Sequence, residues 1–240
     1  MTSSIYERYK IYAKEYKMNI SNMRKLWGII KPICFHPEFL ARCEKPFYHH
    51  DTKMLGDHII CDAIVTYIIA QKLKERNEKF KHLRVETAVV IAMFHDLYEI
   101  PWQNTFNKKR LRNKHGFVHP IEATVNSITW FPEYFTNKEK ALIIIDGIMH
   151  HMYPLPVRAV DKSDIELNNQ KKYDALPEKY KNMIKLSTDI GKIGHYSFRK
   201  SFFTEGKIMS KADKMVALKK DIGSINGYIA LLSGKNKNIK

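Results

Sequence analysis

Residues 85–101 read VETAVVIAMFHDLYEIP and place a His-Asp pair in an otherwise apolar segment. The segment is apolar enough to form a central helix to about Glu99, and Pro101 closes it. His95 and Asp96 would lie at the C-terminal end of that helix, where burying the carboxylate is costly unless a cation or hydrogen-bond donors compensate it. Because a bound metal would compensate both side chains at once, this segment predicts a metal site.

Further histidines and aspartates recur along the chain in apolar stretches that are expected to be helical: His58, His119, the pair His150-His151, and Asp213. Neutral imidazole and carboxylate are ligands that Mn, Fe, Co or Zn accept, and one carboxylate can bridge two ions. Nucleophilic catalysis by a cysteine or serine has no comparable support in the sequence. The ordered set therefore predicts a metal site assembled from several helices.

The rest of the chain also favours helices. Apolar spacing predicts one or two amphipathic helices that end at Pro32, and a helix from about Met54 to Leu73. A further helix is expected to start at about His119, with Pro120 in its first turn. Another is expected to run from a cap at Thr136 or Asn137 to His150-His151, and a last one from about Lys207 to Leu232. Because strand-like alternation and internal repeats are lacking, the expected fold is all-α.

A chain of 240 residues suits one sizeable core and is short for two full domains. We expect residues 1–46 to form a helical extension packed on the core, residues 47–232 to form the main domain, and residues 233–240 to form a basic tail. The stretch at about 161–181 is polar and rich in Lys and Asn, which predicts an insertion or mobile lid with low core content.

The chain carries 41 Lys and Arg against 25 Asp and Glu, and this net charge of +16 predicts attraction to anions such as nucleotides, nucleic acid or acidic lipid. A Lys-rich solvated surface explains the same charge equally well.

The three cysteines lack a C-x-x-C spacing, which favours free thiols and a cytoplasmic location. Since no signal peptide and no run of about 20 apolar residues is present, we expect a soluble protein with no membrane partner.

Over residues of about 47–220 the motifs resemble those of the HD-domain metal-dependent phosphohydrolases. That signature is matched by His58 in LGDHIICDAI, His95-Asp96 in AMFHDLYEIPW and Asp213 in IMSKADKMVAL. The two-metal branch adds a His and a His pair, for which the candidates are His119 in KHGFVHPIEA and His150-His151 in GIMHHMYPLPVR. The resemblance is strongest to bacterial members with HGF-x-HP and HM-[WY]-PL elements. It implies a compact HD-domain helical bundle around a mono- or dinuclear metal site.

The resemblance also implies the ligand roles. One ion would be held by His58, His95, Asp96 and Asp213, and a second by Asp96, the expected bridge, with His119 and either His150 or His151. The cofactor would be one or two divalent ions, Mn, Fe, Co or Zn, with Mg as a further option. The simpler interpretation of each side chain is a hydrogen-bonded polar residue of the core.

The candidate catalytic residues are Asp96, Glu99 and His115. Glu99 suits proton transfer or water positioning, but it also suits an ordinary solvated helix end. His115 could orient a ligand or take up a leaving-group proton, or it could be a plain loop residue. Leu97, Tyr98 and Glu99 follow the His-Asp pair where HD-GYP phosphodiesterases carry their own signature, so cyclic-di-GMP is disfavoured as a substrate.

The candidate phosphate-binding residues are basic. Arg110 and Arg112 belong to the basic loop that precedes the HGF-x-HP element, Arg158 follows the HM-[WY]-PL element, and Lys214 lies beside the final Asp of the signature. His49 precedes the first signature His closely in the chain, and for it a surface position is favoured over a place in the pocket.

We therefore expect an all-α phosphohydrolase that uses one or two divalent ions to hydrolyse a phosphomonoester or phosphodiester. Its partner would be a phosphorylated small molecule, a nucleotide or dinucleotide. An alternative of another class is a nucleic-acid-binding protein that keeps the helical bundle as a scaffold under a basic surface. A weaker alternative is a di-iron oxygenase, because some HD-domain sites hold iron. The sequence decides neither the substrate, nor the metal, nor the oligomeric state.

Overall fold

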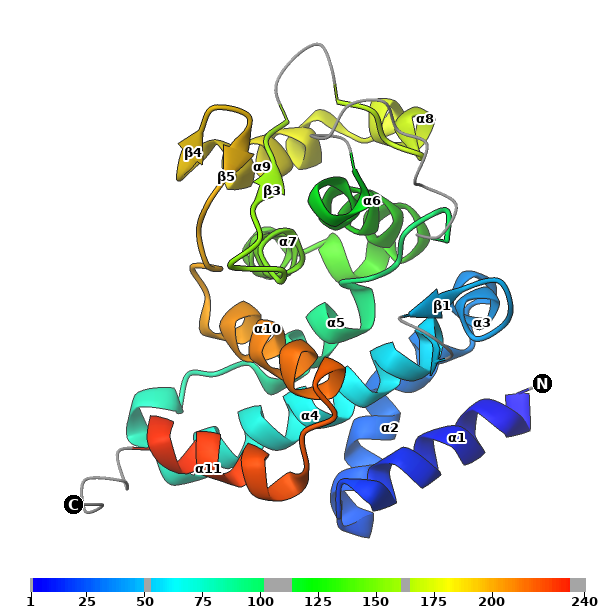
Figure 1. The fold of residues 1–240 in the computed structure, drawn as a ribbon, viewed down its shortest axis with the longest axis vertical. Coiled ribbons are helices and arrows are strands. Elements are labelled where there is room, and N and C mark those ends of the chain that lie inside the picture. The colour runs from blue at the N-terminus through cyan, green and yellow to red at the C-terminus, as the bar shows by residue number, and fades with distance from the viewer. Residues whose placement is uncertain (1, 50–52, 102–113, 161–164, 234–240) are drawn as a thin grey trace.

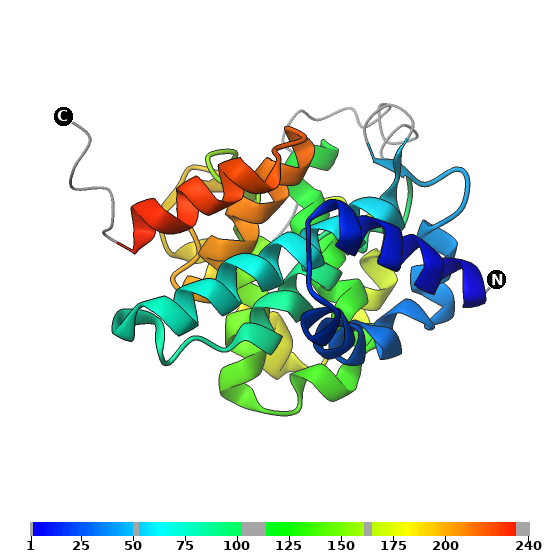
Figure 2. The ribbon, with the colours of Figure 1, turned by 90° about the horizontal axis from the view of Figure 1, so that it is seen from below.

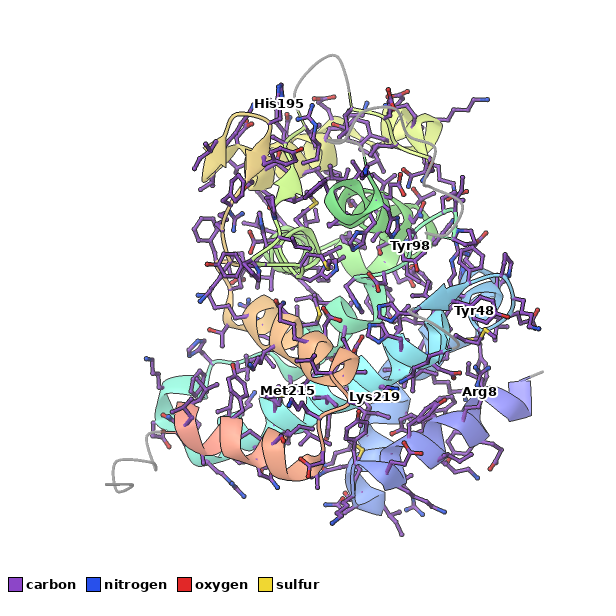
Figure 3. All side chains as sticks on the ribbon, in the orientation of Figure 1. Arg8, Tyr48, Tyr98, His195, Met215 and Lys219 are labelled. Carbon is purple, nitrogen blue, oxygen red and sulfur yellow. The ribbon has the colours of Figure 1, made fainter. Side chains whose placement is uncertain are left out.

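Two buried helices, α4 (Leu55–Arg76) and α5 (Val85–Phe94), cross the centre of the structure (Figure 1). All residues from Leu55 to Ala70 on α4, and from Thr87 to Phe94 on α5, are buried. A helix that is buried on every face has neighbours on all sides. The helices that pack against this pair therefore form a shell around it, and side chains fill the space between them (Figure 3).

The computed structural model describes residues 2–49, 53–101, 114–160 and 165–233. In chain order the other α-helices of this part are α1 (Thr2–Glu15), α2 (Ile20–Cys34), α3 (Pro37–Arg42), α6 (His115–Trp130), α7 (Lys138–Met149), α8 (Gln170–Ala175), α9 (Glu178–Asp189), α10 (Thr204–Ala217) and α11 (Ile222–Leu232). The prediction of an all-α fold is confirmed. Two short 3₁₀ helices, η1 (Glu78–Phe80) and η4 (Pro132–Phe135), lie in connections.

The strands of the described residues are each two residues long. β1 (Tyr48–His49) pairs antiparallel with β2 (Lys53–Met54), directly ahead of α4. β5 (Tyr196–Ser197) lies between β3 (Val157–Arg158) and β4 (Lys192–Ile193), and both pairings are antiparallel. These ladders fasten loops to the bundle and do not form a sheet core.

The shell helices meet the central pair from different directions. α1 and α11 pack against α4, α2 packs against α5, and α10 packs against both α4 and α5. α7 packs against α5, α6, α9 and α10. Figures 1 and 2 show the N-terminal helices and the α10–α11 pair on different sides of α4. The C-terminal end of α5 is thereby surrounded by α4, α6, α7 and α10.

Two helix ends differ from the prediction near this point. α5 ends at Phe94, so His95 caps it and Asp96 lies in the following turn, whereas the predicted helix ran to Glu99. The turn is fixed because the buried side-chain amide of Asn126 donates a hydrogen bond to the Leu97 carbonyl, at 2.6 Å. α6 begins at His115, four residues earlier than expected, which leaves Pro120 inside the helix.

The predicted ends of the first and last helices are also corrected. Pro32 does not end α2, which continues to Cys34. The predicted helix from Lys207 to Leu232 is two helices, because the chain leaves α10 after Ala217 and Asp221 caps α11 by accepting a hydrogen bond from the Ser224 amide. The cap at Asn137 is confirmed, since its side chain accepts from the Lys140 amide at 2.9 Å.

The insertion or mobile lid with low core content at about 161–181 stays a prediction, and part of this stretch is helical. Residues 161–164 lie outside the described residues, and most of the stretch 165–181 belongs to α8 and α9. Leu167, Leu176 and Tyr180 join the buried core. The Asn169 side-chain amide donates to the Asn126 side-chain oxygen at 2.8 Å, which fastens this segment to α6.

Within the described residues, no helix has both the length and the apolar character needed to cross a bilayer. The three cysteines are unpaired and buried. The proposed division of the chain at residues 46 and 232 stays a prediction, and residues 234–240 of the expected tail lie outside the described part.

The buried thiols test the packing directly. Burial raises the pKa of Cys43 and of Cys61 to about 12, and it raises the pKa of Cys34 well above the usual value, so all three thiols stay protonated at pH 8. We expect iodoacetamide to label the native protein at least about 100-fold more slowly than the urea-unfolded chain, because the thiolate is the nucleophile. Mass spectrometry measures the labelling, and rapid modification of one cysteine in the native state would contradict the packing around it.

Candidate metal centre

The candidate centre lies where the C-terminal end of α5 meets α4, α6, α7 and α10. Each of these elements contributes at least one buried side chain: His58 and Asp62 from α4, His95 and Asp96 from the end of α5, His119 from α6, His151 from the end of α7, and Asp213 from α10. Most of the ligands predicted from the sequence are therefore brought together by the fold.

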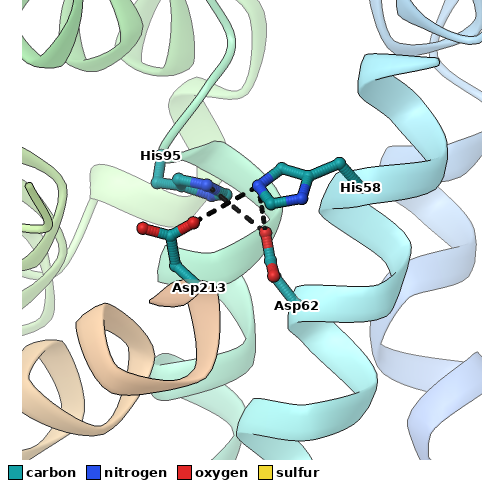
Figure 4. A group of neighbouring side chains, drawn as sticks. All are labelled: His58, Asp62, His95 and Asp213. Atoms are coloured by element: carbon teal, nitrogen blue, oxygen red, sulfur yellow. Dashed lines mark ion pairs between the residues drawn. The ribbon is translucent and has the colours of Figure 1, made fainter. Parts of the chain in front are cut away.

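Four of these side chains form a first group (Figure 4). His58 Nε2 lies 2.9 Å from Asp62 Oδ2 and 3.3 Å from Asp213 Oδ1. His95 Nε2 lies 3.5 Å from Asp62 Oδ2. Two ligand atoms about 2.1 Å from a common ion, at angles of about 90–110°, are about 3.0–3.4 Å apart. The group can therefore hold a metal ion with modest adjustment.

Asp62 is a member of this group that was not predicted from the sequence. Its carboxylate is fully buried, and burial raises its pKa while the nearby His58 opposes the rise. Both of its oxygens lack a well-directed hydrogen bond. The signal was present in the sequence, because Asp62 follows His58 by four residues and so shares its helix face.

Asp96 connects this group to a second one. Its Oδ2 atom lies 3.4 Å from His95 Nε2 and 4.0 Å from His58 Nε2. Its Oδ1 atom lies 3.4 Å from His119 Nε2 and 3.6 Å from His151 Nε2. The two oxygens of one carboxylate therefore face two different pairs of histidines, which is the arrangement expected of a bridging ligand.

His49 also reaches the centre. Its ring stacks on the His58 ring at 3.5 Å between centroids with an interplanar angle of 7°, and its Nε2 atom lies 3.7 Å from Asp96 Oδ2. The favoured surface position was wrong. The β1–β2 hairpin folds His49 back over the start of α4, and this is a tertiary contact that the local sequence does not indicate.

Backbone carbonyls fix the tautomer of three of the histidines. The Nδ1 atoms of His95, His119 and His151 lie 2.8, 3.0 and 2.7 Å from the carbonyl oxygens of Ala92, His115 and Ile148. A carbonyl only accepts hydrogen bonds, so each Nδ1 carries the proton. Each Nε2 then presents its lone pair to the centre, as metal-binding histidines do.

This tautomer assignment creates an electrostatic conflict between His119 and His151. Their Nε2 atoms lie only 3.0 Å apart and are buried. Two lone pairs at that distance repel each other unless a proton or a metal cation lies against them. The buried Nε2 atoms of His58 and His95 likewise lack a well-directed hydrogen bond. The donor set at Asp96 therefore fits a metal ion.

The pKa shifts show the same concentration of charge. Burial alone would raise the pKa of Asp96, but His95 and His119 hold it well below the usual range. Burial would lower the pKa of His58, but Asp62 and Asp213 raise it to about 10. A metal ion that binds at His58 must therefore displace a proton from that ring.

Of the two adjacent histidines, only His151 belongs to the centre. His150 Nε2 lies 3.1 Å from the Ser187 carbonyl oxygen and 3.2 Å from Ser187 Oγ. Burial and the positive charge of Arg199 lower the pKa of His150 to about 4. His150 caps α7 and turns toward α9, so its role as a metal ligand is wrong.

A cavity of about 450 Å³ opens onto the centre and is lined by His49, Asp96, Tyr98, His115, Gly116, His119, His151, Met152, Pro154, Leu155, Asp213, Lys214 and Ala217. Tyr98 (Figure 3) packs edge-on against His115 at 4.6 Å, and the His115 ring stacks on His119 at 4.7 Å. His115 thus stands at the cavity, beside the second group of ligands.

Lys214 lines this cavity, but its ammonium group is occupied. It donates to the His151 carbonyl oxygen at 3.0 Å, to the Ser210 carbonyl oxygen at 3.0 Å and to Ser210 Oγ at 2.8 Å. Because an ammonium has three protons, all its donors are used. Lys214 therefore holds the backbone of His151 in place, and its predicted contact with substrate phosphate is not what the structure shows.

Four other predicted site residues either do not line the cavity or lie outside the described residues. Glu99 forms an ion pair with Lys172 at 2.7 Å and does not line the cavity, because the helix that would have aligned it with Asp96 ends at Phe94. Arg158 is fully buried in β3 and donates to the carbonyl oxygens of Ala159 and His195, both at 2.9 Å. Arg110 and Arg112 lie outside the described residues.

Comparisons of the chain with protein-family models, with curated proteins and with solved structures gave no match. The fold and the site by themselves define the class of this protein: a helical bundle with buried His and Asp groups that can hold a metal ion.

Metal content tests the centre. We expect about two divalent ions per chain after loading with Mn²⁺ and gel filtration, as a bridging carboxylate between two donor sets implies. Asp96→Ala should lose at least the ion beside His119 and His151, because the shared ligand is gone, while the group around His58 keeps four ligands of its own. His151→Ala should keep about one ion, in the group around His58. Elemental analysis against protein concentration gives the ratio.

The adjacent residue supplies the control. His150→Ala removes a buried histidine from the same helix end but no ligand, so it should keep the wild-type metal content. Equal losses from His150→Ala and His151→Ala would contradict the assignment, and so would full metal content in Asp96→Ala.

Proposed function

We propose that this protein is a divalent-metal-dependent phosphohydrolase of the HD superfamily that hydrolyses a phosphomonoester or phosphodiester of a nucleotide or dinucleotide. The observation that carries the proposal is the position of Asp96, whose two carboxylate oxygens face separate histidine pairs at 3.4–4.0 Å. A pair of divalent ions in such a site supplies a hydroxide nucleophile near neutral pH and positive charge for phosphate oxygens.

The geometry of the described residues supports the following ligand roles in this proposal. His58, His95, Asp62 and Asp213 would hold one ion, and His119 with His151 would hold the other, with Asp96 between them. The carbonyls of Ala92, His115 and Ile148 keep three of these imidazoles in the binding tautomer. The centre is therefore organised before any metal binds, which reduces reorganisation during the reaction.

His115 is the side chain best placed to exchange a proton with a bound substrate. It lines the cavity, and its ring stacks on that of His119. Its stacking on His119 and its edge contact with Tyr98 orient the ring. In the proposed reaction His115 donates a proton to the leaving-group oxygen as the bond to phosphorus breaks.

Part of the cavity wall is apolar. Met152, Pro154, Leu155 and Ala217 line it, and Tyr98 adds an aromatic face. A cavity of about 450 Å³ has the size of a small-molecule site. This supports a substrate with a flat or apolar part, such as a nucleobase, held against that wall while its phosphate faces the ligands.

Activity on simple phosphate esters tests the proposal. We expect Mn²⁺-loaded protein to hydrolyse p-nitrophenyl phosphate, bis-p-nitrophenyl phosphate or one member of a nucleotide panel. His95→Ala and Asp96→Ala should lower kcat/KM by at least about 10³-fold, because each removes a ligand of the charge that stabilises the transition state. His150→Ala should stay within about threefold of wild type, because it leaves the ligand set intact.

Two outcomes would contradict the proposal. One is full activity of Asp96→Ala on a substrate that the wild type turns over. The other is iron-loaded protein that consumes dioxygen and releases no phosphate from any ester, which would favour the oxygenase alternative.

Glu99 and His115 make a second, matched pair of variants. Glu99→Gln should leave kcat within about threefold, because its carboxylate pairs with Lys172 outside the cavity. His115→Asn should lower kcat by about 10²-fold while metal content stays at the wild-type level, since proton transfer of this kind contributes about 10²–10⁴-fold. Steady-state kinetics on the best ester measures both variants, and a larger loss from Glu99→Gln would reverse the assignment.

A further inference from the structure

A second hollow, of about 370 Å³, lies beside the metal cavity and shares Lys214 with it. Its wall combines the end of α7, the segment before α10, one face of α10, and α11, through His150, Tyr153, Lys200, Ser201, Lys207, Ser210, Lys211, Lys214 and Tyr228. This lining contains four lysines and no carboxylate. We call it the lysine hollow.

The charges of the lysine hollow are not neutralised by the protein. Lys207, Lys211 and Lys214 follow one another at spacings of four and three residues, so they share one face of α10. Like charges at these spacings destabilise a helix. Among the described residues, none of these three lysines forms an ion pair with a carboxylate, and Lys200 forms none either. Such a face gains stability when an anion binds.

Aromatic rings hold two of the ammonium groups in place. Lys200 Nζ lies 5.2 Å from the centroid of the Tyr153 ring, and Lys211 Nζ lies 5.3 Å from that of the Tyr228 ring. A cation–π contact positions an ammonium without cancelling its charge. The cationic groups are thus partly preorganised around the hollow, which lowers the entropic cost of binding an anion.

The acidic residue behind this wall is already satisfied. Asp146 accepts hydrogen bonds from Arg199 at 2.6 Å, from the Ser201 hydroxyl at 2.6 Å and from the Phe202 amide at 2.9 Å. It is buried, and its charge is matched by the guanidinium. Asp146 therefore supports the segment that carries Lys200 and Ser201 and does not compensate the lysines.

We propose that the lysine hollow is a binding site for a small organic polyphosphate, separate from the metal cavity. Lys200, Lys207 and Lys211 line the hollow without a carboxylate partner, and three such positive charges suit a ligand with two or more phosphate groups. The buried back wall of His150 and Ser201 and the bounded volume suit a small molecule, whereas a nucleic acid is expected to follow an extended basic stripe. The proposal goes beyond the proposed hydrolysis and does not depend on it, because it concerns binding in the absence of metal.

Inorganic triphosphate and ATP are the probes. Calorimetric titration of the full-length protein in EDTA, at two salt concentrations, should give saturable binding of about one equivalent that weakens as salt rises. Lys207→Ala/Lys211→Ala removes two charges that line this hollow and not the metal cavity, and it should weaken binding at least about tenfold. Lys207→Arg/Lys211→Arg should restore it to within about threefold.

A matched charge control comes from exposed lysines elsewhere. Lys25→Ala/Lys79→Ala removes the same charge from α2 and η1 and should leave triphosphate binding within about twofold of wild type. Asp96→Ala should also bind as wild type does, because the metal cavity takes no part. Since Lys207 and Lys211 are exposed and repel each other, their alanine variant should fold normally, which circular dichroism and a melting curve verify.

Three results would overturn the proposal. The first is no saturable binding of either probe by the wild type. The second is an equal loss in the two alanine double variants, which would assign the effect to general surface charge. The third is a single-stranded oligonucleotide that displaces triphosphate at much lower concentration and loses affinity in Lys207→Ala/Lys211→Ala, which would assign the hollow to a polymer. Failure of ester hydrolysis with normal triphosphate binding would count against the proposed function alone.

Discussion

The repulsion between two imidazole lone pairs, buried 3.0 Å apart on His119 and His151, is the constraint on which the centre depends. Backbone carbonyls hold both rings in the tautomer that presents these lone pairs, so rotation of a proton cannot remove the conflict. Asp96 lies beside them and brings the opposite charge. A metal ion bound there would satisfy the imidazoles and the carboxylate together.

The bundle satisfies this constraint by bringing helix ends and one buried helix face to the same point. α5 stops at Phe94 and releases the His-Asp pair into a turn, and α7 stops at Met149 and turns His151 inward. α4 supplies a carboxylate and an imidazole one helical turn apart, and α10 supplies Asp213. Lys214 and Ser210 then join α10 to the His151 carbonyl, so the two halves of the centre are held by the same contact.

Much of this could be predicted from the sequence, because polar residues inside apolar helices are visible locally. Asp62 is equally visible, because it follows His58 by four residues and shares its helix face. His49, by contrast, reaches the centre only through the fold of a hairpin, and the choice between His150 and His151 rests on the direction of the chain after α7. The positive charge of Arg158 predicts a contact with substrate phosphate, yet the side chain is buried where β3 pairs with β5. The presence of the helices could be predicted from apolar spacing. The residues at which they end could not, because those ends depend on tertiary hydrogen bonds that the local sequence does not indicate.

The most direct test of a bridged two-metal centre is a crystal structure of the Mn²⁺-loaded protein with anomalous diffraction at the manganese edge. We expect two anomalous peaks, one on each side of the Asp96 carboxylate, with His119 and His151 both turned toward the second. A single peak among His58, His95 and Asp213, with a hydrogen bond from a protonated His119 to His151, would show that Asp96 does not bridge two ions and would contradict the central claim.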